Sequence, residues 1–291
     1  MIRSMRFLPL SLCCLLTVSG ACQTIPGTSA DSLRLLNRPA AIQFRRGLEW
    51  QSVRLDTLFG SPQNINILRL RPGKWRLAFG SAGDSLRTTS RLGREKQATA
   101  ALNGTFFSFK GGSVDHIKID GYVLDTTRYT PGKKLEEHRQ AAIVLTKRGK
   151  AAIVFGGADN PRWASERPEP NVMVTGPLLL KGNKRAPLQP NAFNDNRHPR
   201  TCFCLTNDRH VLLITADGRH KNAAGFSLPE LTTVLRWLGC RDAINLDGGG
   251  STTLWLSGQP DNGVVNYPSD SKQWIHTGER PVSNVLLVHP R

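Results

Sequence analysis

Residues 245–253 read Asn-Leu-Asp-Gly-Gly-Gly-Ser-Thr-Thr, which places a carboxylate before three glycines and three hydroxyl side chains. Glycine adopts positive φ at little cost and lets backbone N–H groups approach an anion that a side chain would block. Beside such a turn Asp247 could exchange a proton with a substrate or ligate a metal ion. The same residue types also form plain turns, so this segment alone leaves a ligand site and a simple turn as equal alternatives.

A second aspartate follows another apolar run. Residues 211–216 are strand-like and precede Asp217, Gly218 and Arg219. If the two strands are neighbours, Asp217 and Asp247 converge on one pocket. Arg219 would then neutralise a phosphate while one carboxylate handles a proton.

Two further segments carry groups that bind sugars or anions. Asn103 closes an apolar run and precedes Gly104 and two phenylalanines, which would place an amide beside aromatic walls. Residues 197–201, Arg-His-Pro-Arg-Thr, bring two arginines together, and Arg200 could clamp an anion. The alternatives are a tight turn with core phenylalanines and a solvated basic loop.

The sequence predicts no dedicated metal site and no required cofactor. Asp115 and His116 could bind a divalent metal, but no His-x-x-x-His pair, cysteine ligand pair or calcium loop accompanies them. A Gly-x-Ser-x-Gly elbow and a Walker-type phosphate loop are also missing from the sequence, which disfavours acyl transfer by that route and nucleotide hydrolysis.

These residues must be positioned by a chain rich in short strands separated by Gly and Pro turns. We expect one α+β domain over residues 48–291, built from largely antiparallel or mixed sheets with a few packed helices. The predicted strands cover residues 52–57, 65–71, 75–79, 98–102, 116–119, 141–146, 151–155, 172–175, 201–206, 211–216, 243–246, 253–256 and 282–288.

Helices are expected at residues 227–238 and 85–96. In the first, Ser227 is a natural N-cap, Glu230 stands at the reciprocal capping-box position, and Pro229 falls in the first turn, where its missing N–H is harmless. Gly239 would end this helix.

The N-terminal segment 1–22 has the pattern of an export signal. Two arginines precede a short apolar run, and small residues lead to Cys22. Cys22 is the expected lipid attachment site, with plain cleavage as the alternative, and residues 23–47 are expected to form a tether and lead-in. The protein would then be exported to the periplasm or cell surface, anchored to the membrane by lipid.

The formal net charge is +17, and segment 1–22 contributes only Arg3 and Arg6, which leaves +15 without it. A positive field favours polyanions such as phosphate-bearing glycans, whereas export and the lack of a basic helix argue against nucleic acid. Oligomeric state cannot be derived. In an oxidising compartment a disulfide is expected between Cys240 and either Cys202 or Cys204.

Six ordered motifs together resemble the phosphodiester glycosidase family over about residues 98–289. They are Asn103-Gly104-Thr105-Phe106-Phe107, Thr175-Gly176-Pro177-Leu178-Leu179, Arg197-His198-Pro199-Arg200-Thr201, Asp217-Gly218-Arg219, residues 245–251, and Arg280-Pro281-Val282-Ser283-Asn284.

The resemblance implies a hydrolase that cleaves the glycosidic bond of a sugar-1-phosphodiester in a glycan or cell-envelope polysaccharide. It implies Asp247 and Asp217 as catalytic carboxylates. The implied substrate-binding residues are Asn103, Arg200, Arg219, Asn245, Gly248, Gly249 and Ser251. The alternatives are a non-catalytic surface lipoprotein that binds anionic polysaccharide or aids its assembly or export, and a metal-assisted phosphodiesterase that cleaves the P–O bond.

Overall fold

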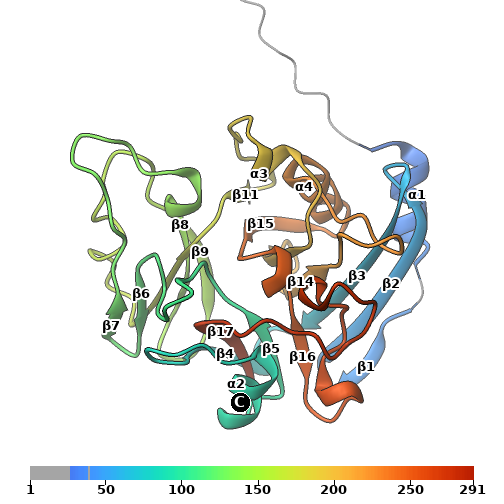
Figure 1. The fold of residues 1–291 in the computed structure, drawn as a ribbon, viewed down its shortest axis with the longest axis horizontal. Coiled ribbons are helices and arrows are strands. Elements are labelled where there is room, and N and C mark those ends of the chain that lie inside the picture. The colour runs from blue at the N-terminus through green and yellow to red at the C-terminus, as the bar shows by residue number, and fades with distance from the viewer. Residues whose placement is uncertain (1–26, 39) are drawn as a thin grey trace, which may run out of the picture.

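The computed structural model describes residues 27–38 and 40–291, which fold as three antiparallel sheets with helices on their outer faces (Figure 1). The predicted signal segment, including Cys22, lies outside the described residues. Within the described part of the chain, no helix is long and apolar enough to cross a membrane.

The largest sheet has eight strands in the order β1-β2-β3-β14-β13-β15-β11-β12, and every neighbouring pair is antiparallel. Its strands are β1 (Ile42–Arg45), β2 (Leu48–Leu58), β3 (Ser61–Leu70), β11 (Leu178–Lys181), β12 (Lys184–Arg185), β13 (Arg200–Thr206), β14 (Val211–Ala216) and β15 (Cys240–Asn245).

Two smaller antiparallel sheets complete the fold, with orders β7-β6-β10-β8-β9 and β16-β5-β17-β4. The five-stranded sheet contains β6 (Ile117–Ile119), β7 (Tyr122–Asp125), β8 (Ala141–Leu145), β9 (Ala151–Phe155) and β10 (Asn171–Thr175). The four-stranded sheet contains β4 (Trp75–Ser81), β5 (Ala100–Asn103), β16 (Leu254–Leu256) and β17 (Asn284–Pro290).

All three sheets bury one face in a shared central core. Alternate residues of a strand face opposite sides of its sheet, so Phe203 packs into this core while Cys202 and Cys204 of the same strand face outward toward α4. The outer faces have separate hydrophobic clusters. The helices are α1 (Ser29–Leu36), α2 (Thr89–Glu95), α3 (Ala192–Asp195) and α4 (Leu228–Trp237), with short 3-10 turns η1 (Glu137–Arg139), η2 (Gly249–Ser251), η3 (Asp261–Gly263) and η4 (Ser269–Ser271).

Helix α4 covers the outer face of the large sheet and follows the prediction closely. Ser227 caps it with the expected capping box, in which the Ser227 hydroxyl accepts from the Glu230 N–H and the Glu230 carboxylate accepts from the Ser227 N–H. Leu231, Val234 and Leu235 are buried at helical spacing. Burial of each such side chain stabilises the fold by about 1.5–3 kcal/mol.

The second predicted helix is shorter than expected, because α2 begins only at Thr89. Arg87 instead forms an isolated β-bridge with Val282, and the Thr88 side chain accepts from the Arg91 N–H as the N-cap. Residues 23–47 were predicted to form a tether and lead-in. Part of this segment is the helix α1, and its Leu35 is fully buried in the hydrophobic cluster under α4.

A disulfide joins two neighbouring strands of the large sheet. Cys204 of β13 pairs with Cys240 of β15, with Cα atoms 5.8 Å apart. Cys202 is a buried free thiol whose Sγ donates to the carbonyl oxygen of Ile244 at 3.1 Å, and burial raises the pKa of this thiol. The fold is therefore the predicted α+β arrangement of largely antiparallel sheets with a few packed helices.

Candidate active site

The ends of β14 and β15 lie at the same edge of the large sheet. Both strands are antiparallel to β13, so Asp217 and Asp247 leave the sheet in the same direction. The prediction that Asp217 and Asp247 converge on one pocket required β14 and β15 to be neighbouring strands. They are not neighbours, because β13 lies between them. Alternate strands of a sheet are about 10 Å apart.

Asn103 fastens the turn that carries Asp247. Its side chain is fully buried, and its Nδ2 donates to the carbonyl oxygen of Asp247 at 2.7 Å. Its Oδ1 accepts from the Thr201 hydroxyl at 2.8 Å and from the Thr253 N–H at 3.0 Å. Asn103 therefore joins three segments beneath the site and positions Asp247.

The glycines after Asp247 let the turn pack closely against Pro199, and they do not present a row of free backbone N–H groups. The Gly249 N–H donates to the carbonyl oxygen of Pro199 at 2.9 Å, so it is not available to a ligand. A Cβ on Gly248 would lie 2.6 Å from that same oxygen. The anion nest predicted from successive N–H groups is thus partly occupied by the protein itself.

Two guanidinium groups lie against the next two glycines. A Cβ on Gly249, whose φ is +59°, would lie 3.3 Å from both terminal nitrogens of Arg219. A Cβ on Gly250 would lie 2.4 Å from Arg280 Nη2 and from Asp270 Oδ1. The turn therefore holds two cations beside Asp247.

The two arginines differ in how free they are to bind an anion. Arg280 forms an ion pair with Asp270 at 2.6 Å. Arg219 is exposed, forms no ion pair within 4 Å among the described residues, and contacts His198 Nδ1 through Nη2 at 3.3 Å. Its charge does act on Asp270, whose pKa it helps to lower. Burial lowers the pKa of His198, and the nearby positive charges act in the same direction. Arg219 is thus the freer anion-binding group.

Asp247 is partly exposed, and its pKa is raised to about 6. Burial is the largest cause, while the Ser251 hydroxyl, the Arg280 charge and the Gly248 N–H act in the opposite direction. A carboxyl group with a pKa near neutrality can take up and release a proton, as general acid–base catalysis requires.

Asp217 is fully buried and organises a loop instead of facing solvent. Its oxygens accept from Asn64 Nδ2 at 2.7 Å, from Asn266 Nδ2 at 3.0 Å and from the Tyr267 N–H at 3.0 Å. Burial raises its pKa to about 7, against the effect of these three donors. These contacts indicate a positioning role.

The loop that Asp217 holds carries a row of stacked rings. Tyr267 stacks on Trp274 with ring centroids 4.0 Å apart and on His276 at 4.1 Å. His220, one residue after Arg219, stacks on Trp274 at 4.9 Å. A face that stacks on a neighbouring ring is not open to a ligand, so these side chains form a packed aromatic wall rather than a set of free faces.

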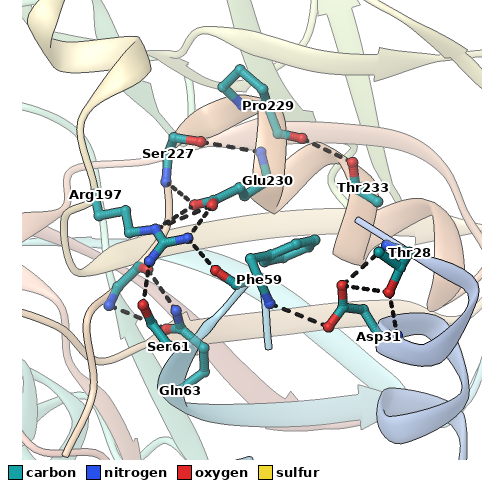
Figure 2. A network of polar contacts seen from close by, with 11 residues as sticks. Thr28, Asp31, Phe59, Ser61, Gln63, Arg197, Ser227, Pro229, Glu230 and Thr233 are labelled. Atoms are coloured by element: carbon teal, nitrogen blue, oxygen red, sulfur yellow. Dashed lines mark hydrogen bonds and ion pairs between the residues drawn. The ribbon is translucent and has the colours of Figure 1, made fainter. Parts of the chain in front are cut away.

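The predicted clamp of two arginines does not form. Figure 2 shows Arg197 directed to the start of α4, where it pairs with Glu230 at 2.5 Å and donates to the carbonyl oxygen of Phe59 at 2.7 Å. Arg200 is buried, and its Nε and Nη2 donate to backbone carbonyls of Phe226 at 2.8 Å and Phe193 at 2.6 Å. Burial lowers the pKa of Arg200 to about 10.

Asn245 and Ser251 are fully buried behind the turn. Asn245 Nδ2 donates to the carbonyl oxygens of Gly176 at 2.9 Å and Leu246 at 2.7 Å, which fixes the end of β15 against the segment before β11. Of the predicted site residues, Asp247, Arg219, Gly248 and Gly249 are therefore accessible or partly accessible, whereas Asn103, Arg200, Asp217, Asn245 and Ser251 support them from below.

Asp115 belongs to a separate buried cluster. It pairs with Arg139 Nε at 2.9 Å and lies 3.6 Å from His138 Nε2, and burial raises its pKa to about 6. Within residues 27–38 and 40–291, no group of three or more His, Cys, Asp or Glu side chains is arranged to hold a metal ion. The absence of a required cofactor stays a prediction.

Asp270, Tyr267 and Trp274 also belong to the site but were not predicted from the sequence. They lie in a loop without periodic pattern, and only the nearby motif at 280–284 indicated that this region reaches the site. Arg280 was part of that motif but was not assigned to the site.

The fold and the site define an α+β protein with a carboxylate on a glycine turn and two arginines packed against that turn. Solved structures share this fold. The zebrafish N-acetylglucosamine-1-phosphodiester alpha-N-acetylglucosaminidase catalytic domain, auto-inhibited by its pro-peptide, matches with a TM-score of 0.63 at 18% identity over 89% of this chain and 93% of that chain. A hypothetical protein from Synechocystis matches with a TM-score of 0.58 at 19% identity, over 88% of this chain and 64% of that one.

The chain belongs to the phosphodiester glycosidase family, whose model matches residues 96–289. A mouse N-acetylglucosamine-1-phosphodiester alpha-N-acetylglucosaminidase is 38% identical over 93 residues, which are 31% of this chain and 17% of the mouse protein. An uncharacterized SPbeta prophage-derived protein of Bacillus subtilis is 29% identical over 115 residues, which are 34% of this chain and 18% of that protein. The chain therefore aligns with less than a fifth of each relative.

Proposed function

We propose that this protein is a hydrolase that cleaves the bond between the anomeric carbon and the phosphate oxygen of a sugar-1-phosphodiester within a glycan. The single observation that carries the proposal is the Asp247 turn, on which the guanidinium groups of Arg219 and Arg280 lie against Gly249 and Gly250. Membership of the phosphodiester glycosidase family supports the same reaction class.

The phosphate of the substrate would bind Arg219, which forms no ion pair within 4 Å among the described residues, with Arg280 adding positive charge. A phosphomonoester leaves readily without being protonated, so the demanding part of the reaction is to place water at the anomeric carbon. Asp247 as a carboxylate would accept a proton from that water. The water oxygen bonds to the anomeric carbon, the C–O bond to phosphate breaks, and the products are a free sugar and a phosphomonoester.

The stacked rings of Tyr267, Trp274 and His276 would form a wall for the sugar. Asp217 would not contact the substrate but would hold this wall in place, because it accepts hydrogen bonds from the backbone N–H of Tyr267 and from Asn266. In this arrangement Asp217 positions the wall, and Asp247 is the catalytic carboxylate.

The N-terminal sequence supports a setting for the reaction in the cell envelope. Segment 1–22 has the export pattern, and Cys22 would carry a lipid anchor. A lipid-anchored enzyme in the periplasm or at the cell surface would meet phosphate-bearing glycans of the cell envelope. The positive net charge of the chain favours such a substrate.

The test is turnover of a synthetic N-acetylglucosamine-1-phosphodiester by purified protein, with free sugar and phosphomonoester measured separately. We expect the wild type to release sugar and phosphomonoester in equal amounts. Asp261→Asn, a control at an exposed carboxylate, should do so at the same rate. Asp247→Asn should release neither at a comparable rate. Absence of turnover across a panel of sugar-1-phosphodiesters, with glycan binding retained, would favour a non-catalytic binding protein.

A further inference from the structure

A cavity of about 450 Å³ lies at the opposite end of the strands from Asp247. Its wall includes the start of β14 at Val211 and the start of β15 at Arg241, whereas the candidate active site lies beyond the other ends of these strands. Six residues of β14 separate the two ends, which corresponds to about 20 Å. We call this cavity the basal pocket.

Five cations and no acidic side chain line the basal pocket: Arg71, Lys150, Arg209, Arg241 and Arg291. They come from three hairpin turns, from β15 and from the residue after β17, so the fold gathers them from distant parts of the sequence. Cavities lined by one sign of charge concentrate ions of the opposite sign. The lining therefore favours an anionic ligand.

Most of these cations are not neutralised by the protein. Arg241 pairs with Asp242 at 2.8 Å. Within the described residues, Arg71, Lys150, Arg209 and Arg291 form no ion pair, although Arg291 donates to the backbone carbonyl of Trp75 at 3.2 Å. Like charges held together without partners repel one another, and a bound anion would remove that repulsion.

The remaining wall of the basal pocket is apolar and includes an indole. Leu70, Leu77 and Leu205 line it together with Trp75. The indole of Trp75 suits the apolar face of a sugar ring.

We propose that the basal pocket is a second binding site, which holds a phosphate-bearing sugar segment of the glycan away from the active site. The cations would bind the phosphate, and the indole and leucines would contact the sugar. The choice of a glycan as ligand rests on the proposed function, in which the substrate is a polymer that repeats phosphate and sugar. Two sites about 20 Å apart on one protein would keep such a polymer bound between successive cleavages.

The test is binding of a fluorescent oligosaccharide with two phosphodiester links to the full protein, measured by anisotropy with Asp247→Asn present in every form so that the probe is not cleaved. The variant Arg71→Glu with Lys150→Glu changes two exposed side chains that form no ion pair or hydrogen bond among the described residues. We expect it to weaken binding by about tenfold or more, since two attractive charges become repulsive. Turnover of a small sugar-1-phosphodiester, measured with Asp247 present, should stay at the wild-type rate.

The matched control is Arg54→Glu with Lys133→Glu, which makes the same change in net charge at exposed positions outside the basal pocket. We expect its binding to remain close to that of the wild type. An equal loss in both double variants, or no loss in either, would overturn the proposal, as would failure of the wild type to bind the probe. Binding to phosphatidylglycerol vesicles in place of the probe, lost in the pocket variant, would overturn it in favour of a lipid site. If no form turned over the small sugar-1-phosphodiester but the predicted binding pattern was observed, the proposed function would be refuted and the second binding site would be supported.

Discussion

Replacement of Asn103 tests whether one buried amide holds the candidate active site together. Asn103 makes three hydrogen bonds, to the carbonyl oxygen of Asp247, the hydroxyl of Thr201 and the N–H of Thr253. Asn103→Ala leaves these groups without their partner in a fully buried position. Each buried polar group that loses its partner costs about 1–3 kcal/mol, so the loss of three partners should lower the free energy of unfolding of Asn103→Ala by about 3 kcal/mol or more.

Asn103→Asp keeps the shape of the side chain but changes one of its hydrogen-bonding atoms. The Oδ1 acceptor is kept, but the donor to the Asp247 carbonyl becomes an oxygen, which repels that carbonyl unless the new carboxyl group is protonated. The pKa of the introduced aspartate in the folded state should therefore be raised above its unfolded value of about 3.9. A raised folded pKa means that the folded protein binds more protons, so stability falls as pH rises between the two pKa values.

The assay is urea unfolding of wild type and variant at several pH values, with the difference in free energy of unfolding taken at each pH. We expect Asn103→Asp to be nearly as stable as the wild type at about pH 4 and to lose about 1.4 kcal/mol per pH unit above that until the folded pKa is reached. Asn207→Asp, at an exposed asparagine, is the control and should change stability by less than about 0.5 kcal/mol at every pH. A loss from Asn103→Asp that is the same at every pH would refute the reasoning.

Four further outcomes follow from the site. Asp247→Asn should lower kcat/KM by about 10²–10⁴-fold with little change in stability, as shown by steady-state kinetics beside urea unfolding. Wild-type kcat/KM should rise with pH through about pH 6, because the pKa of Asp247 is raised to about 6 and the reaction needs its carboxylate form; a flat profile would contradict this role. Gly249→Ala should lower the free energy of unfolding by about 1–2 kcal/mol and raise KM, since φ is +59° and the new Cβ would meet Arg219. Asp217→Asn should reduce the affinity for the sugar, measured as an inhibition constant for the free sugar, more than it reduces kcat, because Asp217 holds the aromatic loop.

Much of the fold could be predicted from local pattern. The strands at residues 151–155 and 211–216 have the predicted bounds, because apolar runs between turn residues determine them. The edge strand Ile42–Arg45 was missed because three of its four residues are exposed, which removes the hydrophobic signal. The start of α2 was misplaced because the bridge between Arg87 and Val282 joins segments far apart in the sequence.

The site could be predicted by residue type but not by accessibility. Arg197, Arg200 and Arg219 look equivalent in the sequence, yet Arg197 pairs with Glu230, Arg200 donates to backbone carbonyls, and Arg219 stays exposed. Likewise Asp217 and Asp247 both precede glycine after a strand. Asp217 is nevertheless buried and accepts hydrogen bonds from three donors, whereas Asp247 is partly exposed. Which polar groups are used internally depends on tertiary contacts that no local pattern reveals.

The position of the cleaved bond tests the central claim most directly. Hydrolysis of a sugar-1-phosphodiester in ¹⁸O-labelled water places the label on the sugar if the C–O bond breaks and on the phosphate if the P–O bond breaks. The phosphate is the decisive product, because its oxygens do not exchange with water under assay conditions whereas a free sugar can exchange its anomeric oxygen. We predict an unlabelled phosphomonoester that forms with the wild type and not, at a comparable rate, with Asp247→Asn. A labelled phosphomonoester would contradict the account and indicate a phosphodiesterase that attacks phosphorus.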